Sequence, residues 1–150
     1  MDIIEVKRLY DLNLNDTFFD SFKKDYIFED RCYRNKNRKC YVSYKGDKID
    51  GLLVLKIEDK HKDFDGIYPV LNNKKRLKIC TFKVVRNYLV AKRFIELIFN
   101  TINEYDLDEI YFTIYNNDSS KKKLIKYLNG HGFNYYGLKF DKEEVYVWKK

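Results

Sequence analysis

The stretch Lys78–Tyr105 constrains the fold most, because it combines a strand, a short polar turn and a long helix. Lys78–Val85 is rich in β-branched and aromatic residues, which favours a strand. Apolar residues recur at helical spacing over Leu89–Tyr105, which predicts a helix after the turn Arg86–Tyr88. A helix that starts just after a strand points backbone N–H groups and the positive end of its dipole into the space there. The stretch therefore indicates either an anion site, with pyrophosphate the obvious candidate, or a unit used for packing alone.

Composition limits the class of protein. The chain has 150 residues, 45% hydrophobic and 17% aromatic, which fits one globular domain with a sizeable core. A net charge of +7 allows attraction to nucleic acid or to the phosphates of a cofactor, although acidic and basic residues are interspersed. Three cysteines without a CxxC pair favour a reduced, cytoplasmic compartment. The sequence shows neither a signal-peptide pattern at its start nor an apolar run of membrane-spanning length, so we expect no membrane association.

The rest of the chain predicts short elements around this unit. The strand–helix–strand order makes the strands Lys78–Val85 and Glu109–Tyr115 parallel neighbours. A Gly-Asp turn between two apolar runs predicts a β-hairpin. The other expected elements are a strand at Ile3–Lys7, a helix at Asp16–Tyr26, a short helix or loop at Ile27–Arg34, the hairpin strands Cys40–Tyr44 and Ile49–Ile57, a helix at Ser120–Asn129 and a closing hairpin of Phe133–Phe140 and Glu144–Trp148.

Glycines and apolar runs give finer expectations. Gly51, inside a hairpin strand, indicates a bulge or a close backbone approach. Leu52–Ile57 is nearly all apolar, which predicts a central strand covered on both faces. Gly130-His-Gly132 is expected to end the preceding helix with a glycine in the left-handed C-cap conformation.

Two polar segments leave alternatives open. The basic run Arg31–Lys39 is a solvated loop or, with Tyr33 stacking, a contact for nucleic acid or an acidic substrate. The long connection Glu58–Arg76 has the length of a functional loop. Its His61 lies among aspartates, but one histidine in such a loop fits a solvated segment better than a metal site, so we predict no metal.

Four segments carry the pattern of a known family: Tyr41–Ile57 with its Gly-Asp-Lys-Ile-Asp-Gly turn, Leu77–Val84, Leu107–Tyr115 followed by Leu124–Phe133 ending in Gly-His-Gly-Phe, and Glu143–Trp148. Over nearly its whole length the chain resembles the GNAT family, the Gcn5-related N-acetyltransferases. Leu77–Val84 is similar to the cofactor strand of a subgroup often joined to toxin–antitoxin or nucleic-acid-associated domains. The resemblance implies a single α/β (α+β) domain over 1–150, with a mixed, mostly antiparallel sheet of about seven strands, a parallel central pair and about four helices.

The resemblance also implies acetyl-CoA as co-substrate. The family's phosphate loop reads Arg/Gln-x-x-Gly-x-Gly/Ala, and the matching frame here is Arg86-Asn-Tyr-Leu89-Val-Ala91. Leu89 replaces the glycine that lets the backbone approach phosphate, and it is accommodated there if its backbone stays helical and its side chain points into the core. The implied cofactor contacts are Phe82, Lys83, Val84, Arg86, Leu89, Val90, Ala91, Lys92, Asn116 and Asn117.

The implied mechanism is direct attack of an amine on the acetyl thioester between the two parallel strands. Backbone N–H groups of Phe82–Val84 would hold the thioester oxygen. Glu58 is the first candidate for the general base, and an exposed strand-end carboxylate is its alternative interpretation. Tyr127 is the candidate proton donor to the CoA thiolate, although Leu128 occupies the family's usual position and one residue is about 100° of helix.

Other side chains near this site have structural alternatives. Asn116 or Asn117 would hydrogen-bond the pantetheine arm or cap the next helix. Cys80 is expected to be a buried core cysteine rather than a cleft residue.

The sequence therefore predicts an acetyl-CoA-dependent N-acetyltransferase whose amine acceptor, a small molecule or a protein, is not specified. The alternative is a catalytically weak or inactive GNAT-fold module that holds nucleic acid or an acidic protein on a basic surface. We expect a monomer or a homodimer.

Overall fold

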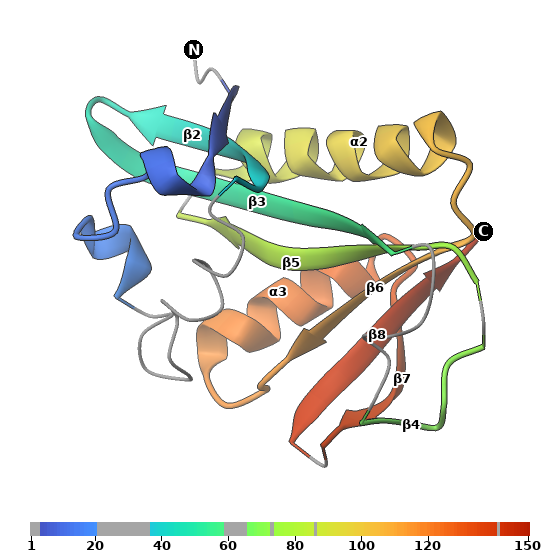
Figure 1. Ribbon diagram of the computed structural model, residues 1–150. Coiled ribbons are helices and arrows are strands. Elements are labelled where there is room, and N and C mark those ends of the chain that lie inside the picture. Colours follow the sequence, from blue (N-terminus) through green and yellow to red (C-terminus); the bar gives the residue numbers. More distant parts are fainter. Residues whose placement is uncertain (1–3, 21–36, 59–65, 73, 86, 141) are drawn as a thin grey trace. The chain divides into compact units, whose positions relative to one another are not determined.

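The computed structural model describes residues 4–20, 37–58, 66–72, 74–85, 87–140 and 142–150. Eight strands form one mixed, mostly antiparallel sheet in the order β1-β2-β3-β5-β6-β8-β7-β4, with β5 and β6 parallel (Figure 1). The fold class expected from the sequence is confirmed, with eight strands rather than about seven and, in the described part, two α-helices and two short 3₁₀ helices. The chain divides into two compact units, Met1–Leu55 with Thr81–Ile98, and Lys56–Cys80 with Phe99–Lys150.

The first unit is built on an antiparallel hairpin. β1 (Ile4–Arg8) pairs with β2 (Lys39–Lys45), which pairs with β3 (Lys48–Glu58) across the predicted Gly-Asp turn. Asp16 joins the N-terminal segment to this hairpin, because its two carboxylate oxygens accept the N–H groups of Phe18 and Ile49 at 2.9 and 3.0 Å. One core cluster contains Leu9, Leu12, Phe18, Phe19, Cys40, Val42, Ile49, Leu52 and Val54.

The helix expected at Asp16–Tyr26 is a 3₁₀ turn at Thr17–Phe19 in the described residues, and the rest of that range lies outside them. The tyrosine of the basic run, Tyr33, and the histidine of the long connection, His61, also lie outside the described residues.

Gly51 sits where the long helix α2 (Tyr88–Glu104) packs closely on the hairpin. A Cβ added at Gly51 would lie 2.9 Å from Val90 Cγ1, 3.3 Å from Ser43 Cβ and 3.4 Å from Phe94 Cε2. The β2–β3 register also shifts beside this residue, since Ser43 opposes Gly51 and Tyr44 opposes Ile49. Both the close approach and the bulge predicted here are confirmed. Because Leu52 belongs to the N-terminal core cluster and Leu53 and Val54 are buried as well, the first part of the apolar run is covered on both faces, as predicted. The prediction is wrong for the end of the run, where Leu55 is half-buried and Ile57 is exposed.

Replacing Gly51 with Ala should destabilise the fold by about 1–3 kcal/mol, because a stiff β-branched side chain must move to admit the new methyl group. Urea denaturation followed by circular dichroism measures the loss. The Gly51→Ala/Val90→Ala double variant removes the 2.9 Å contact, so its cost should be smaller than the sum of the two single costs. Strict additivity would show that this contact does not limit the position.

The second unit contains the C-terminal half of the sheet. It holds β4 (Ile67–Tyr68), the start of β5 (Arg76–Val84), β6 (Glu109–Ile114), α3 (Ser119–Asn129), β7 (Asn134–Lys139) and β8 (Glu143–Lys149). On one face, the Phe112 ring stacks on Tyr146 at 5.2 Å and meets Phe133 at 5.6 Å. Another buried cluster comprises Ile67, Leu71, Tyr111, Val145 and Val147.

The end of α3 differs from the expectation at one glycine. Gly130 has a right-handed conformation with φ of −63°, whereas Gly132 adopts the left-handed one with φ of +96°. The left-handed glycine is therefore Gly132, two residues beyond the C-cap residue Gly130. None of the helices in the described residues is both long and apolar enough to span a membrane.

Candidate active site

The parallel strands β5 and β6 separate soon after they begin. Within the described residues they pair at Arg76–Glu109, Leu77–Ile110 and Lys78–Tyr111, although β5 continues to Val84 and β6 to Ile114. The burial of β5 changes phase beyond that point, because Leu77 and Ile79 are buried two residues apart but the next buried side chain is Phe82, three residues on. A shift of one residue in the alternation of buried and exposed side chains is typical of a β-bulge, a feature common beside active sites. The backbone pairing of the two strands therefore ends at Lys78 and Tyr111, and we call this end of the pairing the β5–β6 opening.

A buried carboxylate lies at the start of this opening. Glu58, the last residue of β3, is 3% exposed, and its Oε1 accepts a hydrogen bond from the hydroxyl of Tyr111, which is 1% exposed. Lys56 Nζ lies 3.3 Å from Glu58 Oε2, and Lys78 Nζ lies 6.0 Å from the centre of the Tyr111 ring. The interpretation of Glu58 as an exposed strand-end carboxylate is therefore wrong. Sequence reasoning missed Tyr111, since its partner is 53 residues away and no local pattern links the two.

The start of α2 is organised by Asn87. Its side-chain oxygen accepts the N–H of Val90 at 3.3 Å, and its carbonyl accepts the N–H of Ala91 at 3.2 Å. Asn87 therefore acts as the N-cap, a role for which asparagine before a helix is a known signal that the sequence reasoning overlooked. Arg86 lies outside the described residues.

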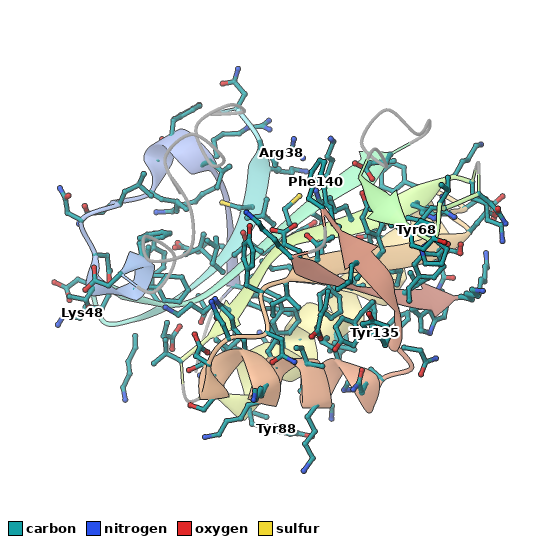
Figure 2. The ribbon with its side chains drawn as sticks, turned by 90° about the horizontal axis from the view of Figure 1, so that it is seen from below. Arg38, Lys48, Tyr68, Tyr88, Tyr135 and Phe140 are labelled. Carbon is teal, nitrogen blue, oxygen red and sulfur yellow. The ribbon has the colours of Figure 1, made fainter. Side chains whose placement is uncertain are left out.

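Leu89 does not point into the core. The helix begins at Tyr88, one residue earlier than expected, and the side chains of Tyr88 (labelled in Figure 2) and Leu89 are 70% and 67% exposed. Of the two conditions for accommodating Leu89 at the phosphate site, the helical backbone is met and the inward side chain is not. Ala91 is half-buried and Lys92 is exposed, so this first turn presents backbone and a cation to solvent.

Two side chains near the end of β5, those of Phe82 and Lys83, contact other parts of the first unit. Phe82 is buried edge-on to Phe94 of α2, with ring centres 5.6 Å apart. Lys83 Nζ donates to the carbonyl of Phe18 and lies 4.5 Å from the centre of that ring. Burial lowers the pKa of Lys83, against the opposing effect of Asp20 and Asp16. Because Lys83 holds the 3₁₀ turn, its backbone rather than its ammonium group is what it can offer a ligand, as for half-buried Val84.

Asn116 and Asn117 follow β6 and are exposed. Asn116 Nδ2 lies 3.3 Å from both carboxylate oxygens of Glu144, and Asn117 Oδ1 accepts from Lys121 Nζ at 2.9 Å. Neither caps α3, because Asp118 does so by accepting the N–H of Lys121 at 2.9 Å. The capping interpretation of these asparagines is wrong, and their amide groups lie at the surface.

Tyr127 is half-buried on α3, with its ring 4.9 Å from that of His131. Leu128, in the position the family resemblance assigns to a tyrosine, is buried. Cys80 is exposed, which corrects the expectation of a core cysteine. Regular alternation explains the difference, since Leu77 and Ile79 are buried and Cys80 lies on the opposite face of the strand.

No protein-family model matches the sequence, and no curated protein matches it. Solved structures do. The chain is similar to the IAA acetyltransferase from Bacillus cereus ATCC 14579, with a TM-score of 0.64, 13% identity and 100% of each chain covered. It is similar to an acetyltransferase of the GNAT family from Listeria monocytogenes 4b F2365, with a TM-score of 0.61, 14% identity and 99% and 95% of the two chains covered.

A third similar structure holds a ligand. Arabidopsis thaliana Naa50, solved in complex with the bisubstrate analogue CoA-Ac-MVNAL, matches with a TM-score of 0.60 and 15% identity, covering 98% of this chain and 99% of that one. The fold of this protein is therefore the fold of the GNAT acetyltransferases.

Proposed function

We propose that residues 1–150 work as one GNAT-family domain that transfers an acetyl group from acetyl-CoA to an amine. The observation that carries this proposal is the separation of β5 from β6 just beyond Tyr111, with the buried, oriented carboxylate of Glu58 at that point. Support also comes from the shared fold with acetyltransferases, one of them solved with a CoA-containing analogue.

The residues at the junction of β5 and α2 suit the binding of acetyl-CoA, a thioester that carries phosphate groups. Leu89 is exposed in the first turn of α2, so its backbone N–H, together with Lys92 and Arg86, would hold the pyrophosphate. The N–H groups of Val90 and Ala91 are bonded to Asn87. Backbone N–H groups of Phe82–Val84 would hold the thioester oxygen, and Asn116 or Asn117 the pantetheine amides. Acetyl-CoA, when bound, supplies the activated acetyl group.

The chemistry assigned to the chain is proton transfer. Glu58 takes a proton from the acceptor ammonium group, and the freed lone pair forms the C–N bond to the acetyl carbon. The C–S bond breaks and CoA leaves as a thiolate, which receives a proton from Tyr127 or from water. The acceptor is a primary amine of a small molecule or a protein.

A binding module on the same fold is the second candidate. The exposed Leu89 side chain stands where the family resemblance expects glycine, and the net charge of +7 favours polyanions. In this case the chain would hold nucleic acid or an acidic protein without catalysis, as suits the subgroup linked to toxin–antitoxin systems. Retention on a nucleic-acid column that falls steeply with salt, without any response to acetyl-CoA, would favour this candidate.

Acetyl-CoA should raise the melting temperature of the protein. At a concentration 100 times its Kd, a ligand that binds the folded state alone adds about 2.7 kcal/mol, or roughly 5–10 °C for a chain of this size. Ala91→Glu should abolish the rise, because it places a carboxylate in the first turns of α2. Asn100→Glu is the matched control, since it adds the same charge to an exposed position farther along the helix and should keep the rise. No rise at millimolar acetyl-CoA would refute the proposed function.

A further inference from the structure

We propose that Tyr111 is the positioning residue of the catalytic base: its hydroxyl holds the Glu58 carboxylate ionised and oriented at the opening between β5 and β6. The inference rests on the proposed function and assigns a role to a residue that no family motif identifies. It is carried by the contacts of one buried cluster in the second unit.

The cluster fixes the carboxylate from two sides. The hydroxyl of Tyr111, on β6, donates to Glu58 Oε1, while Lys56, on the same strand as Glu58, lies 3.3 Å from Oε2. The side chain of Glu58 is 1% exposed and that of Lys56 is 31% exposed, so the ammonium group reaches towards solvent while the carboxylate does not. Both carboxylate oxygens of Glu58 are therefore engaged, one by a side chain from β6 and one by a side chain from β3, and these contacts fix the orientation of the group.

The hydrogen bond from the phenol also bears on the charge of the base. Burial on its own favours a protonated carboxyl group, which could not accept a proton. A hydrogen bond donated to the carboxylate, and a nearby ammonium group, favour the ionised form. Lys56 from β3 and the hydroxyl of Tyr111 from β6 both act in that direction.

The hydrogen bond between Tyr111 and Glu58 lies where the pairing of β5 and β6 ends. Tyr111 opposes Lys78 in the last pair before β5 and β6 separate. Its hydroxyl therefore ties the end of β3 to the residue at which the opening begins. A purely structural phenol could occupy any strand of the buried cluster, whereas this one meets a carboxylate at the start of the opening.

The test is Tyr111→Phe, with Tyr146→Phe as matched control. Tyr146 also donates to a carboxylate in this sheet, but its acceptor is Glu144, at 2.6 Å. The pKa of Glu58 is measured by NMR titration of ¹³C-labelled glutamate, with its signal assigned from Glu58→Gln. Acetyl transfer is followed as CoA release from acetyl-CoA with a polyamine, an amino sugar and a peptide with a free N-terminus, from pH 5 to pH 9.

In Tyr111→Phe the pKa of Glu58 should rise, because the bond that favours its ionised form is gone. The acidic limb of the kcat profile should move to higher pH by the same amount. At neutral pH kcat should fall about tenfold to a hundredfold, the range for a hydrogen bond to a charged group, with KM for acetyl-CoA unchanged. Tyr146→Phe should leave the acidic limb in place.

An unchanged pKa of Glu58 in Tyr111→Phe, or an acidic limb that coincides with that of the wild type, would overturn the role of Tyr111. Such a result leaves the proposed function standing if the wild type releases CoA. Absence of both thermal stabilisation by acetyl-CoA and CoA release in the wild type would overturn the proposed function, and the role of Tyr111 with it. A higher pKa without an effect on transfer would show that Tyr111 holds Glu58 for structure alone and would overturn the proposal.

Discussion

Replacing Glu58 with Gln is expected to lower kcat/KM for acetyl transfer by about 10²–10⁴-fold, the usual contribution of a general base. The amide oxygen of Gln can still accept the hydrogen bond that Tyr111 donates to Glu58 Oε1. It cannot take a proton from an ammonium group at neutral pH. The variant therefore removes the base while keeping the contact that holds the strand ends together.

Two measurements separate loss of the base from loss of the fold. Acetyl-CoA should stabilise Glu58→Gln as much as the wild type, because the predicted cofactor contacts do not include Glu58. Glu104→Gln, which changes an exposed carboxylate at the end of α2, should keep full activity. Activity of Glu58→Gln within about threefold of the wild type, an effect far below that of a general base, would show that another group takes the proton.

The hairpin of β2 and β3 could be predicted because its signals are local. Gly46, with φ of +66°, supplies the turn, and Gly51 marks the close approach of α2 by lacking a side chain. The pairing of β5 with β6 could be predicted as well, because a strand–helix–strand unit has one favoured handedness.

The details of the candidate site depend on contacts that the sequence does not display. The exposed side chain of Leu89 follows from where α2 begins, and that depends on which of several polar residues becomes the N-cap. Cys80 is exposed because it lies on the face opposite buried Leu77 and Ile79, and the run of apolar and β-branched residues in β5 does not show which face is covered. β4 has two residues, too few for any periodicity to appear.

Glu58 shows the same limit most clearly. In the sequence it is the polar residue that ends an apolar strand, which is typical of an exposed carboxylate. Its burial is set by a tyrosine from a strand 53 residues away. The role of a strand-end residue therefore follows from the strands that pair around it, and these are fixed by topology rather than by local pattern.

A second buried carboxylate is paired at the first residues of β5 and β6. Arg76, 1% exposed, donates from Nη2 to Glu109 Oε1 at 2.9 Å, and Glu109 is 3% exposed. Arg76 also donates to the carbonyl of Asn72, while Lys74 lies 3.9 Å from the same Glu109 oxygen. Glu109 Oε2 has no hydrogen-bond partner in the described structure, so this carboxylate depends strongly on Arg76. These residues are opposite each other in the register, and the pair therefore joins the two parallel strands where they begin.

Replacing Arg76 with Leu should destabilise the protein by about 3–5 kcal/mol, because it leaves a buried carboxylate without its partner. The double variant Arg76→Leu/Glu109→Leu should recover most of that loss, since an apolar pair of similar volume avoids the cost of burying charge. Urea denaturation followed by circular dichroism measures both, and Lys150→Met, which breaks the exposed pair with Asp106, should change little. If the double variant is as unstable as the single one, the pair is itself a net source of stability. If Arg76→Leu costs no more than Lys150→Met, the carboxylate of Glu109 is satisfied without Arg76, by protonation or by water.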